Sequence, residues 1–174
     1  MGKIVLITGG ARSGKSSFAL EEALKRPGKR IFIATALALD AEMKDRIRKH
    51  REERGEDFAT IEEPLDINSR LTSLPKDVEV VVIDCLTVWL GNLFHKWDNN
   101  EKAVEQEVEK FCKGLTAIKR ELILVTNEVG FGIVPDNHLA RLYRDMLGFL
   151  NRTIAEQADN VYCCICGIPV CIKG

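Results

Sequence analysis

The chain has 174 residues and a formal net charge of −1, from 25 basic and 26 acidic side chains. Apolar residues make up 45% of it and charged residues 29%, an ordinary composition for one globular domain with a full core. The balanced charge argues against a general nucleic-acid binder, which usually shows a basic excess. No apolar run is long enough to span a bilayer. We therefore expect a single domain over residues 1–174.

Residues 4–16 join an apolar run, a glycine-rich turn and the start of a helical pattern. Gly9, Gly14, Lys15 and Ser16 match G-x-x-x-x-G-K-[ST], the phosphate loop. Glycines let backbone N–H groups face phosphate oxygens, and the following helix adds its positive end. We expect Lys15 to reach the β- and γ-phosphates and the Ser16 hydroxyl to bind Mg²⁺. An ordinary turn can match by chance, but a strand before it and a helix after it are the context that nucleotide binding requires.

Apolar strands alternate with helical segments along the rest of the chain, which predicts an α/β fold with a mostly parallel sheet flanked by helices. With the phosphate loop, this pattern indicates the RecA-like architecture of P-loop NTPases, ended by a strand hairpin. The expected strands cover residues 30–36, 58–63, 78–84, 121–126, 160–166 and 170–173. The expected helices cover residues 16–25 (buried through Phe18, Ala19, Ala23 and Leu24), 41–54, 101–119 and 135–158, with 66–74 a short helix or loop.

The strand over residues 78–84 is strongly apolar and ends in Asp84. Downstream of a phosphate loop this is the Walker B pattern, whose acid holds Mg²⁺ directly or through water. Many buried strands end in Asp, so the pattern alone is weak. The phosphate loop upstream makes us prefer the metal-binding role for Asp84.

The predicted helix over residues 41–54 is dense in charge and carries His50 on its apolar stripe. Arg46 and Arg54 lie one helical turn to either side of this histidine. From the pattern alone, the favoured interpretation is a solvated helix with a partly buried structural histidine.

Four of the six cysteines lie near the C-terminal end of the sequence. They are Cys163, Cys164, Cys166 and Cys171. A metal site is one interpretation, but Cys163 and Cys164 point to opposite faces of a strand, and small buried apolar side chains are the interpretation that we prefer. The chain starts directly with the phosphate-loop strand, without an export signal, so we expect a cytoplasmic protein with reduced thiols.

Taken together, these segments resemble one family, the bifunctional adenosylcobinamide kinase/adenosylcobinamide-phosphate guanylyltransferases of cobalamin biosynthesis. The phosphate loop alone does not identify the family, whereas the run 126–135 and the helix that bears His50 are much more specific. The resemblance covers nearly the whole chain in order. The matching stretches are 8–16, 33–35, Asp40, 42–43, 46–47, His50, Arg54, 62–64, 84–87, 92–93, 125–130, 133–135, 140–141, 144–145 and 151–152.

The resemblance implies two reactions. A nucleoside triphosphate, ATP or GTP, phosphorylates the aminopropanol hydroxyl of adenosylcobinamide, and GMP from GTP then passes through a histidine to the new phosphate, releasing pyrophosphate. The guanylylated histidine falls on His50, so the resemblance reverses the preference for a structural histidine; a neutral imidazole can attack the α-phosphorus while nearby arginines stabilise the phosphates. Lys15 is the second expected catalytic residue, and Ser16 and Asp84 are the Mg²⁺ ligands that the phosphate loop and the Walker B pattern predict. The implied nucleotide contacts are Gly9, Gly10, Ala11, Arg12, Ser13, Gly14, Lys15, Ser16, Ile33, Ala34, Thr35, Arg51, Glu52, Glu53, Arg54, Glu62 and Asp84. The stretch 51–53 matches the family only loosely.

The resemblance also implies a homo-oligomer, for which a trimer is one form, with small-molecule substrates as its other partners. Two rival functions remain open at this point. One is a simple small-molecule kinase that needs only the phosphate loop and Asp84. The other is a GTP-dependent switch or binding module with a protein partner.

Overall fold

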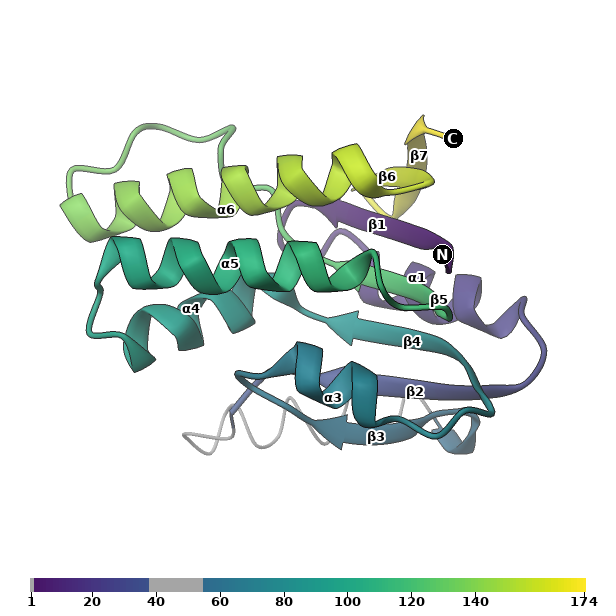
Figure 1. Ribbon diagram of the computed structural model, residues 1–174. Coiled ribbons are helices and arrows are strands. Elements are labelled where there is room, and N and C mark those ends of the chain that lie inside the picture. The colour runs from purple at the N-terminus through teal and green to yellow at the C-terminus, as the bar shows by residue number, and fades with distance from the viewer. Residues whose placement is uncertain (1, 38–54) are drawn as a thin grey trace.

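The computed structural model describes residues 2–37 and 55–174 (Figure 1). In this part of the chain seven strands form one sheet in the order β3-β2-β4-β5-β1-β6-β7. All neighbouring strands are parallel except β6 and β7, which form an antiparallel hairpin. The strands are β1 (Ile4–Gly9), β2 (Lys29–Ala34), β3 (Ala59–Glu62), β4 (Val78–Asp84), β5 (Glu121–Val125), β6 (Asn160–Ile165) and β7 (Ile168–Lys173). The predicted helix over residues 41–54, with His50, lies outside the described residues.

The central strands are apolar at successive positions because helices cover both faces of the sheet. In β1, Ile4 and Leu6 enter one hydrophobic cluster while Val5 and Ile7 enter the other. Because side chains alternate between the faces of a strand, a run of large apolar residues fills both cores at once. These strands therefore occupy the middle of the molecule and fix the position of the loops that follow them.

In the part of the chain that the structure describes, α3, α4, α5 and α6 pack on one face of the sheet and α1 packs on the other (Figure 1). The four are α3 (Ile67–Ser73), α4 (Leu86–Lys96), α5 (Glu101–Leu115) and α6 (His138–Gln157). On the opposite face, α1 (Lys15–Leu24) buries Ala19 and Ala23. None of the helices in the described part of the chain is both long and apolar enough to cross a membrane.

Helix caps explain where two predicted helices differ from the structure. The helix predicted from residue 135 begins at His138, because the Asn137 side chain accepts a hydrogen bond from the N–H of Ala140 and starts the helix there. The helix predicted to residue 119 ends at Leu115 and is followed by a turn. Leu24, predicted to be buried in α1, is 44% exposed, because it lies in the last turn of the helix.

The C-terminal hairpin is present as predicted, but the interpretation of its cysteines is wrong for two of them. Cys164 is buried and Cys163 is half-buried, whereas Cys166 and Cys171 are exposed. Cys171 lies in β7, an edge strand whose residues are all exposed, and Cys166 lies in the turn before this strand. Among the residues that the structure describes, no three His, Cys, Asp or Glu side chains form a group that could hold a metal ion.

Candidate active site

The phosphate loop has the backbone conformation that its glycines allow. Gly9 has φ 143° and Gly14 has φ 88°, values that residues other than glycine rarely adopt. A Cβ atom on Gly9 would also lie only 2.4 Å from the carbonyl oxygen of Cys164. The loop therefore connects β1 to α1 as the sequence predicted, and its two glycines are required by backbone shape and by space.

Lys15 lies at the start of α1, and its side chain folds back over the loop. It is 8% exposed, and its Nζ donates hydrogen bonds to the carbonyl oxygen of Gly10 at 2.5 Å and to Oγ of Ser13 at 3.4 Å. Burial lowers the pKa of Lys15, while the carboxylate of Asp84 acts in the opposite direction. The loop thus holds a desolvated cation at the position where phosphate oxygens are expected.

Four neighbouring strands, β3, β2, β4 and β5, end at the same level and bring several predicted residues together. Ala34 pairs with Glu62 on one side and with Asp84 on the other, and Asp84 pairs with Val125. The carboxyl edge of a parallel sheet is where ligands bind in open α/β folds. Glu62, Asp84 and the phosphate loop therefore share one edge of the sheet.

Thr35 fixes the chain immediately after β2. Its N–H donates to the carbonyl oxygen of Asp84 at 3.2 Å. Its hydroxyl donates to the carbonyl oxygen of Cys85 at 2.8 Å and accepts from the N–H of Cys85 at 2.9 Å. Thr35 and Ile33 are fully buried, so these two predicted contacts build the end of β2 beside Asp84.

The segment after β5 is joined to the phosphate loop and to α6 by a polar network. The N–H of Glu128 donates to the carbonyl oxygen of Gly9 at 3.0 Å. Asn151 accepts from the Thr126 hydroxyl at 2.8 Å and donates to the carbonyl oxygen of Asn127 at 3.0 Å. Asn151 has no predicted role, although an asparagine within the apolar side of a helix is a usable signal.

Thr87 links this network to α4 and α6. Its hydroxyl accepts from the N–H of Asn127 at 2.8 Å, and its carbonyl oxygen accepts from the hydroxyl of Tyr143 at 2.7 Å. Asn92 lies further along α4. Its side-chain amide donates hydrogen bonds to the carbonyl oxygens of Thr35 at 2.9 Å and Pro64 at 3.1 Å. The polar residues of α4 therefore tie together the chain segments that leave β2, β3 and β5.

The turn between β6 and β7 packs against the phosphate loop from the other side. The N–H of Gly167 donates to the carbonyl oxygen of Ser13 at 3.2 Å. A Cβ atom on Gly14 would lie 3.3 Å from the Cα atom of Gly167. The hairpin thus supports the loop, a role that the sequence did not reveal.

The residues at this edge fit a magnesium ion bound together with nucleotide phosphates. Ser16 is half-buried in the first turn of α1, and Asp84 lies near enough to influence the pKa of Lys15. Hydroxyl and carboxylate oxygens are suitable Mg²⁺ ligands, and phosphates and water usually complete the octahedron. Ser16 and Asp84 are therefore the pair that would hold the ion.

The cysteines at the site are poor candidates for a covalent carrier. Burial raises the pKa of the Cys85 thiol to about 11 and also raises the pKa of Cys164. A thiol acts as a nucleophile in its thiolate form, and these two stay protonated near neutral pH. Of the remaining predicted residues, Arg12 is exposed on the loop, and Arg51, Glu52, Glu53 and Arg54 lie outside the described part.

The fold resembles that of a solved recombinase. The crystal structure of the RadB recombinase aligns with a TM-score of 0.54 and 15% sequence identity, over 93% of this chain and 74% of that chain. At this identity the similarity concerns the fold alone. It confirms the predicted RecA-like architecture.

The sequence comparisons identify a family. The CobU family, cobinamide kinase / cobinamide phosphate guanyltransferase, matches residues 5–172. The bifunctional adenosylcobalamin biosynthesis protein CobP of Pseudomonas aeruginosa is 40% identical over 169 residues, which are 97% of this chain and 96% of the relative. The bifunctional adenosylcobalamin biosynthesis protein CobU of Escherichia coli is 36% identical over 181 residues, covering 98% of this chain and 99% of the relative.

These matches confirm the predicted resemblance and favour a bifunctional enzyme over a simple kinase or a GTP-dependent switch. The kinase and guanylyltransferase reactions both use nucleotide substrates, which is consistent with a phosphate loop at the carboxyl edge of the sheet. The chain belongs to the cobinamide kinase / cobinamide phosphate guanylyltransferase family and is a bifunctional enzyme of adenosylcobalamin biosynthesis.

Proposed function

We propose that one triphosphate site, built on residues 9–16, serves both reactions with ATP or GTP. The observation that carries this proposal is the meeting of the phosphate loop, Asp84 and the segment after β5 at one sheet edge. Lys15 binds the β- and γ-phosphates, and the loop amides bind the remaining oxygens. Mg²⁺, held by Ser16 and Asp84, neutralises phosphate charge when it is bound.

In the kinase reaction, the aminopropanol hydroxyl of adenosylcobinamide attacks the γ-phosphorus of the triphosphate. The new phosphorus–oxygen bond forms while the bond to the β-phosphate oxygen breaks, and the nucleoside diphosphate leaves. Lys15 stabilises the charge that develops on the phosphoryl oxygens, because its ammonium is held in a site largely closed to water. Positioning and charge stabilisation supply most of the catalysis in phosphoryl transfer.

In the guanylyl transfer, a ring nitrogen of His50 attacks the α-phosphorus of GTP and pyrophosphate leaves. The phosphate of adenosylcobinamide phosphate then attacks the guanylyl phosphorus, the phosphorus–nitrogen bond breaks, and adenosylcobinamide-GDP forms. The family resemblance supports His50 as the carrier. The raised thiol pKa of Cys85 supports it indirectly, since this neighbour of Asp84 stays protonated.

Residues 1–174 act as one cytoplasmic domain that assembles into a homo-oligomer, with a trimer as the expected form. The exposed edge strand β7 supports self-association. Its Ile168, Val170 and Ile172 are 65%, 45% and 63% exposed, and an unpaired apolar edge readily pairs with another chain. Light scattering at micromolar concentration tests the assembly, and a monomer would contradict it.

Incubation with labelled GTP tests the function. A guanylyl adduct that survives denaturation and base but is released by acid is expected for a phosphoramidate on histidine. In parallel, adenosylcobinamide with ATP should give adenosylcobinamide phosphate. Phosphorylation without any adduct would overturn the proposed carrier, and nucleotide binding without transfer to a corrinoid would overturn both steps.

A further inference from the structure

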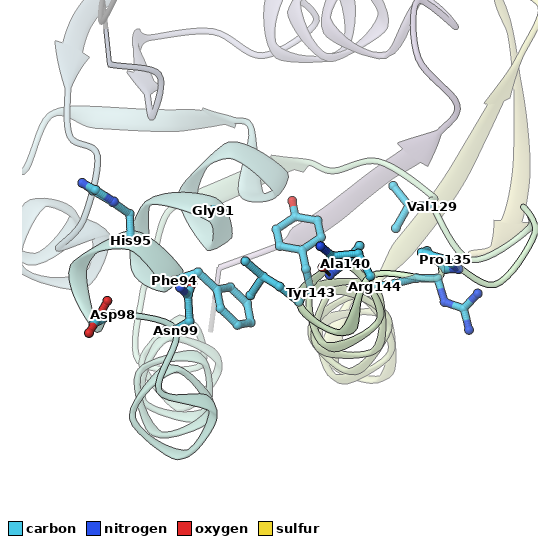
Figure 2. A pocket seen from close by; sticks show the side chains of 12 residues that line it. Gly91, Phe94, His95, Asp98, Asn99, Val129, Pro135, Ala140, Tyr143 and Arg144 are labelled. Carbon is cyan, nitrogen blue, oxygen red and sulfur yellow. Dashed lines mark hydrogen bonds between the residues drawn. The ribbon is translucent and has the colours of Figure 1, made fainter.

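A cavity of about 780 Å³ lies beyond the carboxyl edge of the sheet. Its walls come from the second half of α4, the first turns of α6 and the segment between β5 and α6 (Figure 2). Small-molecule sites in proteins typically occupy about 300–1,000 Å³. The cavity therefore has the size of a ligand site. Of its lining residues, Tyr143 alone belongs to the hydrogen-bond network described above, through its bond to Thr87.

One wall of the cavity is apolar and aromatic. Phe94 and Tyr143 lie with their ring centroids 5.8 Å apart, and Ala140 of α6 lies on the same side of the cavity (Figure 2). Leu139, the preceding residue of α6, also lines the cavity. The Tyr143 hydroxyl is used in its bond to the carbonyl oxygen of Thr87, so its ring is held in place. This wall suits a flat or methyl-rich ligand.

Polar side chains surround the apolar wall. The cavity is also lined by His95, Asp98, Asn99, Asn137 and Arg144. Together they offer guanidinium and amide N–H donors as well as carboxylate and amide acceptors. An apolar wall with several hydrogen-bonding groups suits a ligand that has an apolar ring and a rim of amides.

The cavity is connected to the phosphate loop through a short stretch of chain. Val129 lines the cavity, and the N–H of the preceding Glu128 donates to the carbonyl oxygen of Gly9. The segment that follows β5 therefore contacts both the cavity and the phosphate loop. A ligand in the cavity can extend a flexible arm to the γ-phosphate.

We propose that this cavity binds the corrin ring of the acceptor, adenosylcobinamide, and leaves its aminopropanol arm free to reach the phosphate loop. The inference rests on the function proposed above. A corrin combines a conjugated, methylated ring with peripheral primary amides, which matches the two kinds of wall. The corrinoid exceeds a drug-sized ligand. Phe131 and Ile133 lie between the lining residues Val129 and Pro135 in the sequence and are 90% and 96% exposed, so they offer apolar surface to the part of the ligand outside the cavity.

Gly91 allows a test that fills the cavity while leaving the charged residues unchanged. It lines the cavity from α4, and a Cβ atom there would meet no atom within 4 Å. Gly91→Leu therefore places a side chain in the cavity and removes a glycine from a helix interior, which favours the helix. Gly148→Leu is the matched control, because Gly148 is an exposed glycine of α6 whose added Cβ also meets nothing.

Equilibrium dialysis measures adenosylcobinamide binding by its absorbance, and a separate titration measures GTP binding. We expect Gly91→Leu to weaken corrinoid binding at least about tenfold, or roughly 1.4 kcal/mol, with GTP affinity unchanged. Gly148→Leu should match the original protein in both. Ala140→Leu fills the same cavity from α6 and replaces Gly91→Leu in the binding test if Gly91→Leu does not fold.

The outcomes separate this proposal from the proposed function. If the original protein phosphorylates adenosylcobinamide and the folded cavity-filling variants bind it with unchanged affinity, the corrinoid site is elsewhere and the function stands. If the original protein neither binds nor phosphorylates adenosylcobinamide, both proposals are overturned. Loss of GTP affinity in Gly91→Leu but not in Gly148→Leu would assign the cavity to the nucleotide instead.

Discussion

The N–H of Gly167 donates a hydrogen bond to the carbonyl oxygen of Ser13 at 3.2 Å, so the turn of the last hairpin supports the phosphate loop. The contact joins two segments that are far apart in the sequence. Gly167 has φ +83°, a conformation that favours glycine. The geometry of the nucleotide site therefore depends on a turn near the C-terminus.

Gly167→Ala should disturb the phosphate loop through this turn. We expect the free energy of unfolding to fall by about 1–2 kcal/mol, because alanine is strained in the left-handed region, and the KM for the nucleotide to rise in both reactions. Urea denaturation and steady-state kinetics measure these effects. Gly148→Ala is the control, since it replaces an exposed helical glycine and should leave KM unchanged. If the variant lost stability but kept its KM for the nucleotide, the turn would not support the geometry of the phosphate loop.

Asn151 should stabilise the segment after β5 through its hydrogen bonds to Thr126 and Asn127. Asn151→Ala leaves the buried Thr126 hydroxyl without this acceptor, and such a loss costs about 1–3 kcal/mol. We expect a lower urea midpoint and slower turnover, because Glu128 and Gly9 are joined through the same segment. Gln106→Ala, on the exposed side of α5, provides the comparison. Equal stability of the two variants would mean that the network contributes little.

Lys15 should lower the free energy of unfolding of the nucleotide-free protein, although both reactions need its charge. Burial lowers its pKa in the folded protein from the ordinary value of 10.5, so its charge destabilises the fold at neutral pH. Lys15→Met should therefore raise the free energy of unfolding at pH 7 while abolishing activity. Urea denaturation of the nucleotide-free protein measures this difference, and Lys119→Met, at an exposed lysine, should change neither property.

The pH dependence gives this prediction a sign. Between the lowered folded pKa of Lys15 and 10.5, the unfolded chain binds more protons than the folded protein. The stability of the original protein relative to Lys15→Met should consequently rise as the pH increases through this window. A difference that grew in the opposite direction would mean that Asp84 outweighs burial at this lysine.

The sequence predicted those parts of the fold and site that depend on neighbouring residues. The strand Val78–Asp84 was predicted with its observed bounds, because a run of apolar residues closed by an acid is a local signal. The phosphate loop was recognised in the same way, from glycine and lysine at fixed spacing. In both cases the chemistry of the residue types determines the local conformation.

Contacts between distant segments could not be predicted in this way. The bond from Gly167 to Ser13 depends on how β6 pairs with β1, which no local pattern specifies. The cavity beside Tyr143 depends on how α4 and α6 are placed relative to each other, and Leu139 of α6 is 40% exposed on the cavity wall although it is a large apolar residue. Cys166 is exposed because it lies in a turn at the edge of the sheet.

The two reactions should separate in single variants. Lys15→Ala should reduce both the phosphorylation of adenosylcobinamide by ATP and the guanylyl transfer from GTP by about 100-fold or more, since both transition states lose a fixed positive charge. Assays of each half-reaction with its own substrates measure this. If only one half-reaction suffers, the two reactions do not share the phosphate loop.

The most direct test of the account is the covalent guanylyl adduct in His50→Ala, with labelled GTP as the probe. We expect the adduct and the transfer to adenosylcobinamide phosphate to disappear, while phosphorylation of adenosylcobinamide remains measurable. His138→Ala, at an exposed histidine that begins α6, should retain both. An undiminished adduct in His50→Ala would contradict the account and assign the guanylyl group to another nucleophile.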